Sequence, residues 1–152
     1  MIEKFISKHK GIRILIIVGY TLYILAVAYL CFFNVGIPDM NLGDYWLGIR
    51  KDRIAHFLMF FPFTFLSYLL YKYTPVLKAL HRHSVSMSFL TGVLIAAATE
   101  IIQKEFIPGR EGDVWDFVAD VTAITLATII LIIYHQIEKK KDRCNSSKVV
   151  DM

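Results

Sequence analysis

The chain has 152 residues, enough for one domain, and 56% of them are hydrophobic. Lysine and arginine outnumber aspartate and glutamate by 17 to 13, which gives a formal net charge of +4 at pH 7. So high an apolar fraction, gathered in long blocks, excludes an ordinary soluble domain and indicates a membrane protein.

Four apolar blocks reach or approach the length of about 20 residues that a helix needs to cross a bilayer. The first, 14–33, contains no charged residue and no small-residue cleavage site follows it, so we expect a retained helix rather than a signal peptide. The others are 54–71, 85–102 and 117–134. A soluble four-helix bundle would need a polar stripe on each helix, and the last block has none in ITLATIILIIY. We predict an all-α integral membrane protein, a four-transmembrane-helix bundle over 14–134.

The basic residues predict that both ends of the chain lie in the cytoplasm, because positive charge resists translocation. Twelve lysines and arginines lie in the two tails and in the loop between the second and third blocks. Five lie in the other two loops. We therefore expect cytoplasmic tails at 1–13 and 135–152, the latter basic, with a mobile polar end from residue 139. Since the charges flank apolar blocks, they argue against nucleic-acid binding.

Ionisable and polar residues stand where three predicted helices end on the outer side. Asp52 and His56 are four residues apart at the start of the second helix and share a face. Glu100 and Gln103 are three residues apart near the end of the third helix and also share a face. The start of the fourth helix carries a stripe of acids, Asp113, Asp116 and Asp120.

These residues should face one another, because an ionisable side chain at the bilayer centre costs about 2.5–3.5 kcal/mol. The possible basic partners of the five acids are Arg53, Arg110 and His56. Either some acids are protonated, or solvent reaches them, or a cation or a basic ligand completes the site. The acids at the starts of helices have a second interpretation, since the helix dipole favours negative charge there. Those acids are Asp52, Asp113 and Asp116.

The same residues resemble the VanZ-like family of bacterial membrane proteins. The resemblance rests on four motifs in this order: Asp52-Arg53-x-x-His56-Phe57, Glu100-x-x-Gln103, Phe106-x-Pro108-Gly109-Arg110 and Asp113-x-x-Asp116-x-x-x-Asp120. The chain departs from the family pattern, which usually has Lys in place of Arg53 and Asn in place of Asp120. The family also often has a Gly three or four residues after that position, where this chain has Ala123 and Ile124. The resemblance implies a multi-pass protein of the bacterial inner membrane, connected with the cell envelope and with resistance to the glycopeptide teicoplanin.

Three functions remain open at this point. The first is a non-catalytic protein whose polar residues recognise a polar lipid, a cell-wall lipid precursor, a glycopeptide or a partner, or simply fix the packing of the helices. The second is a membrane-embedded enzyme acting on a phosphate-bearing lipid or cell-envelope intermediate, with Arg53 and Arg110 holding the phosphate. Its catalytic residues would be His56, Glu100 and Asp116. The third is a small proton-coupled carrier with His56 and Glu100 as a relay.

The ligand-binding residues in these hypotheses are Asp52, Arg53, Gln103, Arg110, Asp113 and Asp120. No motif demands a metal ion, and the sequence designates no cofactor. A hard divalent cation held by the carboxylates is a variant of the enzyme hypothesis.

Overall fold

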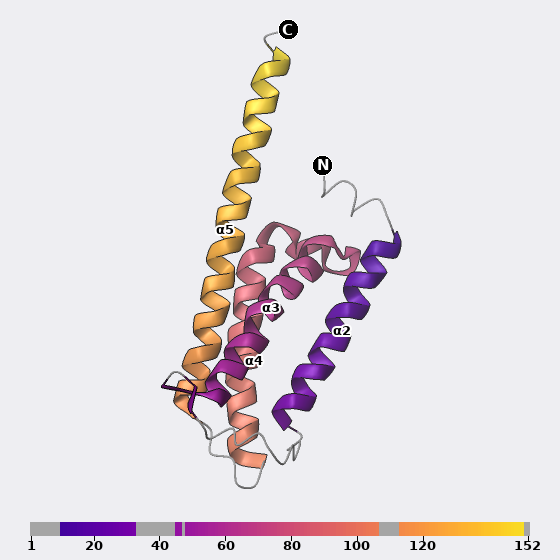
Figure 1. Ribbon diagram of the computed structural model, residues 1–152. Coiled ribbons are helices and arrows are strands. Elements are labelled where there is room, and N and C mark those ends of the chain that lie inside the picture. Colours follow the sequence, from indigo (N-terminus) through magenta and orange to yellow (C-terminus); the bar gives the residue numbers. More distant parts are fainter. Residues whose placement is uncertain (1–9, 33–44, 47, 107–112, 151–152) are drawn as a thin grey trace.

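The computed structural model describes residues 10–32, 45–46, 48–106 and 113–150, which form a bundle of long helices (Figure 1). The long helices are α2 (Lys10–Phe32), α3 (Lys51–Tyr73), α4 (Ser84–Phe106) and α5 (Val114–Val150). A 3-10 helix, η1 (Pro75–His83), joins α3 to α4. The other regular structure in the described part is a small antiparallel hairpin, β1 (Tyr45–Trp46) and β2 (Ile49–Arg50), directly before α3. Gly48 has a φ of 80° in its turn, a conformation that glycine adopts without a steric penalty.

Four helical segments in the described residues are long and apolar enough to cross a membrane. They are Lys10–Phe32, Lys51–Tyr73, Ala79–Phe106 and Val114–Lys141. The predicted fold class, an all-α bundle of four membrane-length helices, is confirmed. Each segment extends past at least one end of its predicted block, because hydropathy identifies the apolar middle of a helix and not its polar ends.

The distribution of burial is the reverse of that in a soluble bundle. Large apolar side chains point outward, as with Leu15 at 70% exposure and Leu94 at 60%. Several polar side chains are buried instead, including Thr64, Ser67 and Ser88 at 0% exposure. Such extensive apolar surface suits contact with lipid, and buried polar groups suit the interior of a membrane bundle. The structure therefore indicates an integral membrane protein.

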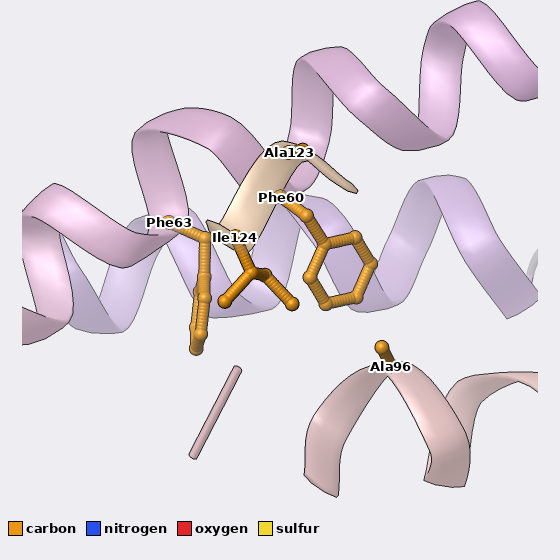
Figure 2. Packing of buried hydrophobic residues seen from close by; sticks show 5 residues of the cluster. All are labelled: Phe60, Phe63, Ala96, Ala123 and Ile124. Carbon is orange, nitrogen blue, oxygen red and sulfur yellow. The ribbon is translucent and has the colours of Figure 1, made fainter. Parts of the chain in front are cut away.

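The apolar core lies where α3, α4 and α5 meet. Figure 2 shows Ile124 of α5 near Phe60 and Phe63 of α3, with Ala96 of α4 close by. A further small residue, Gly92, brings α4 close to α5, since a Cβ built on it would lie 3.2 Å from side-chain atoms of Ile124. Small residues of this kind allow membrane helices to pack tightly.

Helix α2 lies at the side of this core and packs mainly on α3 (Figure 1). The hydroxyl of Tyr23 donates a hydrogen bond of 2.6 Å to the carbonyl of Met59 in α3. Pro62 has no N–H, and it therefore leaves one carbonyl of α3 without its helical donor. The carbonyl of Met59 is next to that one. Helix α3 continues through Pro62, and neighbouring helices commonly supply such donors in membrane bundles.

Helix α5 is longer than the sequence predicts. We expected a mobile polar tail from residue 139, but the helix continues to Val150 and extends beyond the other helices (Figure 1). The residues that continue it include Glu138, Lys139, Lys140 and Lys141, which favour helix because they lose little rotamer freedom there.

Candidate functional site

The starts of α3 and α5 and the end of α4 lie at the same end of the bundle (Figure 1), and we call this the polar end. The end of α2 joins them there, because Nε2 of Gln103 in α4 donates a 3.2 Å hydrogen bond to the carbonyl of Cys31. Both residues are buried, Gln103 at 3% exposure and Cys31 at 1%. Gln103 was predicted as a ligand-binding residue, and its amide N–H instead connects two helices.

His56 occupies the centre of the polar end, with its side chain 1% exposed. Its Nδ1 lies 3.1 Å from Oδ1 and 3.2 Å from Oδ2 of Asp120 in α5, and donates to that carboxylate in the tautomer with a proton on Nδ1. Oε1 of Glu100 in α4 lies 3.8 Å from the same nitrogen, beyond hydrogen-bond distance but within reach of an ion pair. The carboxylate of Asp120 therefore fixes the orientation of the imidazole ring.

Asp52 and Asp116 complete what we call the polar cluster, whose members are Asp52, His56, Glu100, Asp116 and Asp120. One carboxylate oxygen each from Asp52 and Asp116 and a ring nitrogen of His56 lie within 4.8 Å of one another. A second group, formed by His56, Glu100 and Asp120, meets the same limit. Both groups contain nitrogen and oxygen atoms that are able to ligate a metal ion.

Asp113 has structural partners at the edge of the polar cluster. Its Oδ1 accepts a 2.9 Å hydrogen bond from the backbone N–H of Trp115, which caps the start of α5. Its Oδ2 accepts hydrogen bonds of 2.9 Å from Arg50 and 3.1 Å from Arg53. The N–H of Trp115, and then the guanidinium groups of Arg53 and Arg50, hold the pKa of Asp113 below its ordinary value.

Arg53 makes two further contacts. Its Nε lies 3.8 Å from Oδ1 of Asp116, and its guanidinium carbon lies 5.7 Å from the ring centroid of Trp115. The sequence did not single out Arg50 or Trp115 as site residues. Arg50 is an extended residue directly before α3, so helical spacing from Arg53 does not predict its position.

Several buried atoms of the polar end have no hydrogen-bond partner among the described residues. They are Nε of Arg53, Nε2 of His56, both carboxylate oxygens of Glu100 and Oδ1 of Asp116. Buried polar groups are paired in the great majority of cases, so a concentration of unpaired ones at one place is a feature of binding sites.

The structure thus brings together eight of the nine predicted site residues at the polar end. The predicted ligand-binding residue Arg110 lies outside the described residues, as does most of the motif 106–110. Comparisons of the chain with models of known protein families, with characterised proteins and with solved structures give no match. The VanZ-like resemblance accordingly remains a prediction from the motifs.

Proposed function

We propose that the chain is a multi-pass membrane protein that binds a polar ligand of the cell envelope at its polar end. The observation that carries this proposal is the set of buried atoms on His56, Glu100 and Asp116 that have no hydrogen-bond partner among the described residues, two of them having only ion-pair contacts of 3.8 Å. Leaving one buried polar group unpaired costs about 1–3 kcal/mol, so a protein keeps several of them only where something offsets the cost. A bound polar ligand offsets it by supplying the missing hydrogen bonds or charge.

The charge at the polar end favours a ligand that presents hydrogen-bond donors or positive charge. The polar cluster contains four carboxyl groups and one imidazole, while Arg50 pairs with Asp113 outside the cluster and Arg53 is shared between Asp113 and Asp116. A phosphate placed between Glu100 and Asp116 would meet carboxylates, which makes this geometry less suitable for phosphate than the sequence hypothesis assumed. Amines and hydroxyls of polar lipids, cell-wall precursors or glycopeptides match the cluster better.

The opposite end of the bundle supports an outward orientation of the polar end. A cavity of about 550 Å³ there is lined by basic residues that include Lys72, Arg82 and Lys139. Positive charge collects on the cytoplasmic side of membrane proteins, so this end belongs inside and the polar end belongs outside. An outward site agrees with the envelope and teicoplanin connection that the VanZ-like resemblance implies.

Teicoplanin susceptibility and an envelope-stress reporter test the proposal in bacterial cells that produce the protein. We expect Glu100→Ala and Asp116→Ala to return both readouts to those of cells without the protein. Glu138→Ala, at the opposite end of the bundle, is the matched control and should behave as the wild type, with equal membrane levels checked by immunoblot. Wild-type activity in both cluster variants, or no effect of the wild-type protein on either readout, would contradict the proposal.

The hydrogen-bonded pair of His56 and Asp120 favours a second candidate function, an enzyme acting on a phosphate-bearing lipid or envelope intermediate. A carboxylate that orients an imidazole is a common arrangement for general acid–base chemistry. Purified protein incubated with extracted phosphate-bearing membrane lipids would show conversion by mass spectrometry, and His56→Gln would abolish it. If the wild type converts none of these lipids, the enzyme candidate is rejected and the binding function remains.

A further inference from the structure

We infer that the polar cluster holds a divalent transition-metal cation such as Zn²⁺ or Mn²⁺, with His56, Asp52 and Asp116 as its protein ligands. This inference deepens the proposed function, and it rests on that proposal in taking the polar cluster as a binding site. It adds the chemical class of the ligand, which neither the motifs nor the resemblance provides.

The three proposed ligand side chains lie close together. A ring nitrogen of His56 and one oxygen each of Asp52 and Asp116 lie within 4.8 Å of one another. Zinc bonds to nitrogen and oxygen are about 2.0–2.2 Å long, so small rotations of the two carboxyl groups bring all three atoms to one cation. Asp52 and His56 are one turn apart on α3, and Asp116 comes from the first turn of α5. The ligands are therefore held by two packed helices.

Two buried atoms of the proposed ligands lack hydrogen-bond partners among the described residues, which is independent of how close the carboxylates lie. His56 is 1% exposed, and its Nε2 has no hydrogen-bond partner among the described residues. Asp116 is 4% exposed, and its Oδ1 also lacks one. A cation between these atoms would satisfy both at once.

Asp120 explains why Nε2 is the ligating atom. Metal-bound histidines almost always donate their other ring N–H to a carboxylate or carbonyl, which fixes the tautomer. The Nδ1 of His56 lies 3.1 Å from Asp120, so Nε2 is left for the cation. The alternative group with Glu100 and Asp120 would require Nδ1 to exchange this hydrogen bond for a metal bond, and it would leave Nε2 unpaired.

The donor set selects the class of cation. Imidazole together with carboxylates suits zinc, manganese and iron, whereas calcium and magnesium prefer oxygen ligands alone. A divalent charge also counters the excess of carboxylates at the polar end, where Arg50 pairs with Asp113 and Arg53 is shared between Asp113 and Asp116.

Titration of the purified full-length protein tests this inference. The protein is treated with a chelator in detergent, and Zn²⁺ binding is followed by calorimetry, with Co²⁺ absorption as a spectroscopic probe. We expect the wild type to bind one equivalent, and His56→Gln and Asp116→Asn to weaken binding at least about tenfold. Asp120→Asn should weaken it about 10–100-fold, as loss of an orienting carboxylate does in other metal sites.

Two matched variants make the assignment specific. Glu100→Gln should weaken binding less than Asp116→Asn does, whereas His135→Gln, at a histidine of the opposite end that contacts Tyr68, should leave affinity within about threefold of the wild type. An effect of Glu100→Gln as large as that of Asp116→Asn would overturn the ligand set by moving the cation to the second group. Unchanged binding in His56→Gln would also overturn it. Helicity measured by circular dichroism shows whether each variant is folded.

The wild type alone is sufficient to contradict the inference. If it binds no stoichiometric Zn²⁺, or if bound Co²⁺ lacks the absorption bands of a nitrogen-ligated site, no metal is held by His56. The proposed function fails by a different measurement, a wild-type phenotype in both Glu100→Ala and Asp116→Ala cells. If the phenotype is present but no metal binds, the proposal of an envelope ligand stands and the inference of a bound cation is rejected.

Discussion

At the residue scale, Asp113 has two structural roles. Its Oδ1 caps α5 through the N–H of Trp115, and its Oδ2 ties that helix to Arg50 and Arg53 at the start of α3. Its backbone carbonyl accepts the 2.9 Å hydrogen bond from the N–H of Asp116. Of the two interpretations that the sequence left open for Asp113, these contacts support capping, and they hold Asp116 in position beside His56.

The pKa of Asp113 predicts a contribution to stability that is lost in acid. The N–H of Trp115, followed by the guanidinium groups of Arg53 and Arg50, lowers this pKa from its ordinary value of 3.8. A group with a lowered folded-state pKa contributes fully above its unfolded value, and the contribution disappears as the pH falls through the folded value. We expect the Tm of the wild type in detergent to fall more steeply below about pH 4 than that of Asp113→Asn. Parallel Tm curves for the two proteins would contradict this account.

The two tasks of Asp113 separate in a pair of variants. Asparagine is as good an N-cap as aspartate, so Asp113→Asn removes the ion pairs and keeps the cap. Asp113→Ala removes both, and we expect it to unfold with about 1 kcal/mol less free energy than Asp113→Asn at neutral pH. Denaturant unfolding followed by circular dichroism measures this difference. The exposed Glu105→Ala on α4 should match the wild type, and equal stability of the two Asp113 variants would exclude the capping role.

The sequence predicted which residues gather at the polar end better than it predicted how they pair. Helical spacing placed Asp52 and His56 on one face, and the alternating direction of the helices brought Glu100 and Asp120 to the same end. The hydrogen bond between His56 and Asp120 depends on how far α5 is rotated about its own axis against α3. That rotation is set by packing, so periodicity within one helix does not specify it.

At the scale of elements, the contact between α4 and α5 depends on small side chains. Ala96 is 0% exposed and packs in the cluster of Phe60, Phe63 and Ile124 (Figure 2). Ala96→Leu adds atoms where no space is open, and overpacking typically costs about 1–3 kcal/mol. We therefore expect a lower free energy of unfolding and a lower Tm in detergent. Ala98→Leu, on an exposed face of the same helix, is the matched control and should keep the wild-type Tm.

The connection between α2 and α4 predicts a chemical readout. Gln103 donates to the carbonyl of Cys31, whose residue is 1% exposed. Gln103→Met keeps the volume and removes this hydrogen bond, which is worth about 0.5–1.5 kcal/mol. With Cys144 replaced by serine, we expect maleimide to label Cys31 roughly twofold to tenfold faster, measured by mass spectrometry. The exposed Gln136→Met is the control, and an unchanged labelling rate in Gln103→Met would argue against a connecting role.

Hydropathy did not predict where α3 and α4 begin and end. The apolar middles at 54–71 and 85–102 lie inside α3 and α4, but both helices extend into polar residues. Asp52 and Arg53 belong to the first turn of α3, and Lys104 to the last turn of α4. The helix dipole favours Asp52 at the start of α3 and Lys104 at the end of α4, and Arg53 pairs with Asp113. An apolar window registers neither effect.

At the scale of the whole molecule, the two ends of the bundle differ in character. The acids of the polar cluster gather at one end, and Lys72, Arg82 and Lys139 line a cavity at the other. The order of apolar blocks along the chain was enough to predict this separation, because consecutive spans alternate in direction. Which end faces the cell exterior follows only from the charge rule, and so it remains a prediction.

Cysteine labelling decides the orientation. In a background with Cys31→Ser and Cys144→Ser, we expect Ile49→Cys, at a position 49% exposed in the hairpin before α3, to react with an impermeant maleimide in intact cells. Ser86→Cys, at an exposed position near the start of α4, should react only after the membrane is permeabilised. Native Cys144, retained alone, should behave like Ser86→Cys, because both ends of the chain are predicted to be cytoplasmic.

The reverse labelling pattern would place His56 and its neighbouring carboxylates at the cytoplasmic surface. A glycopeptide or a cell-wall precursor outside the membrane could not then reach them, and the envelope proposal would fail. The cation inference would survive that result, since the 4.8 Å grouping of Asp52, His56 and Asp116 does not depend on which side of the membrane it faces. Orientation and metal binding are therefore separate properties of the same bundle, and each has its own measurement.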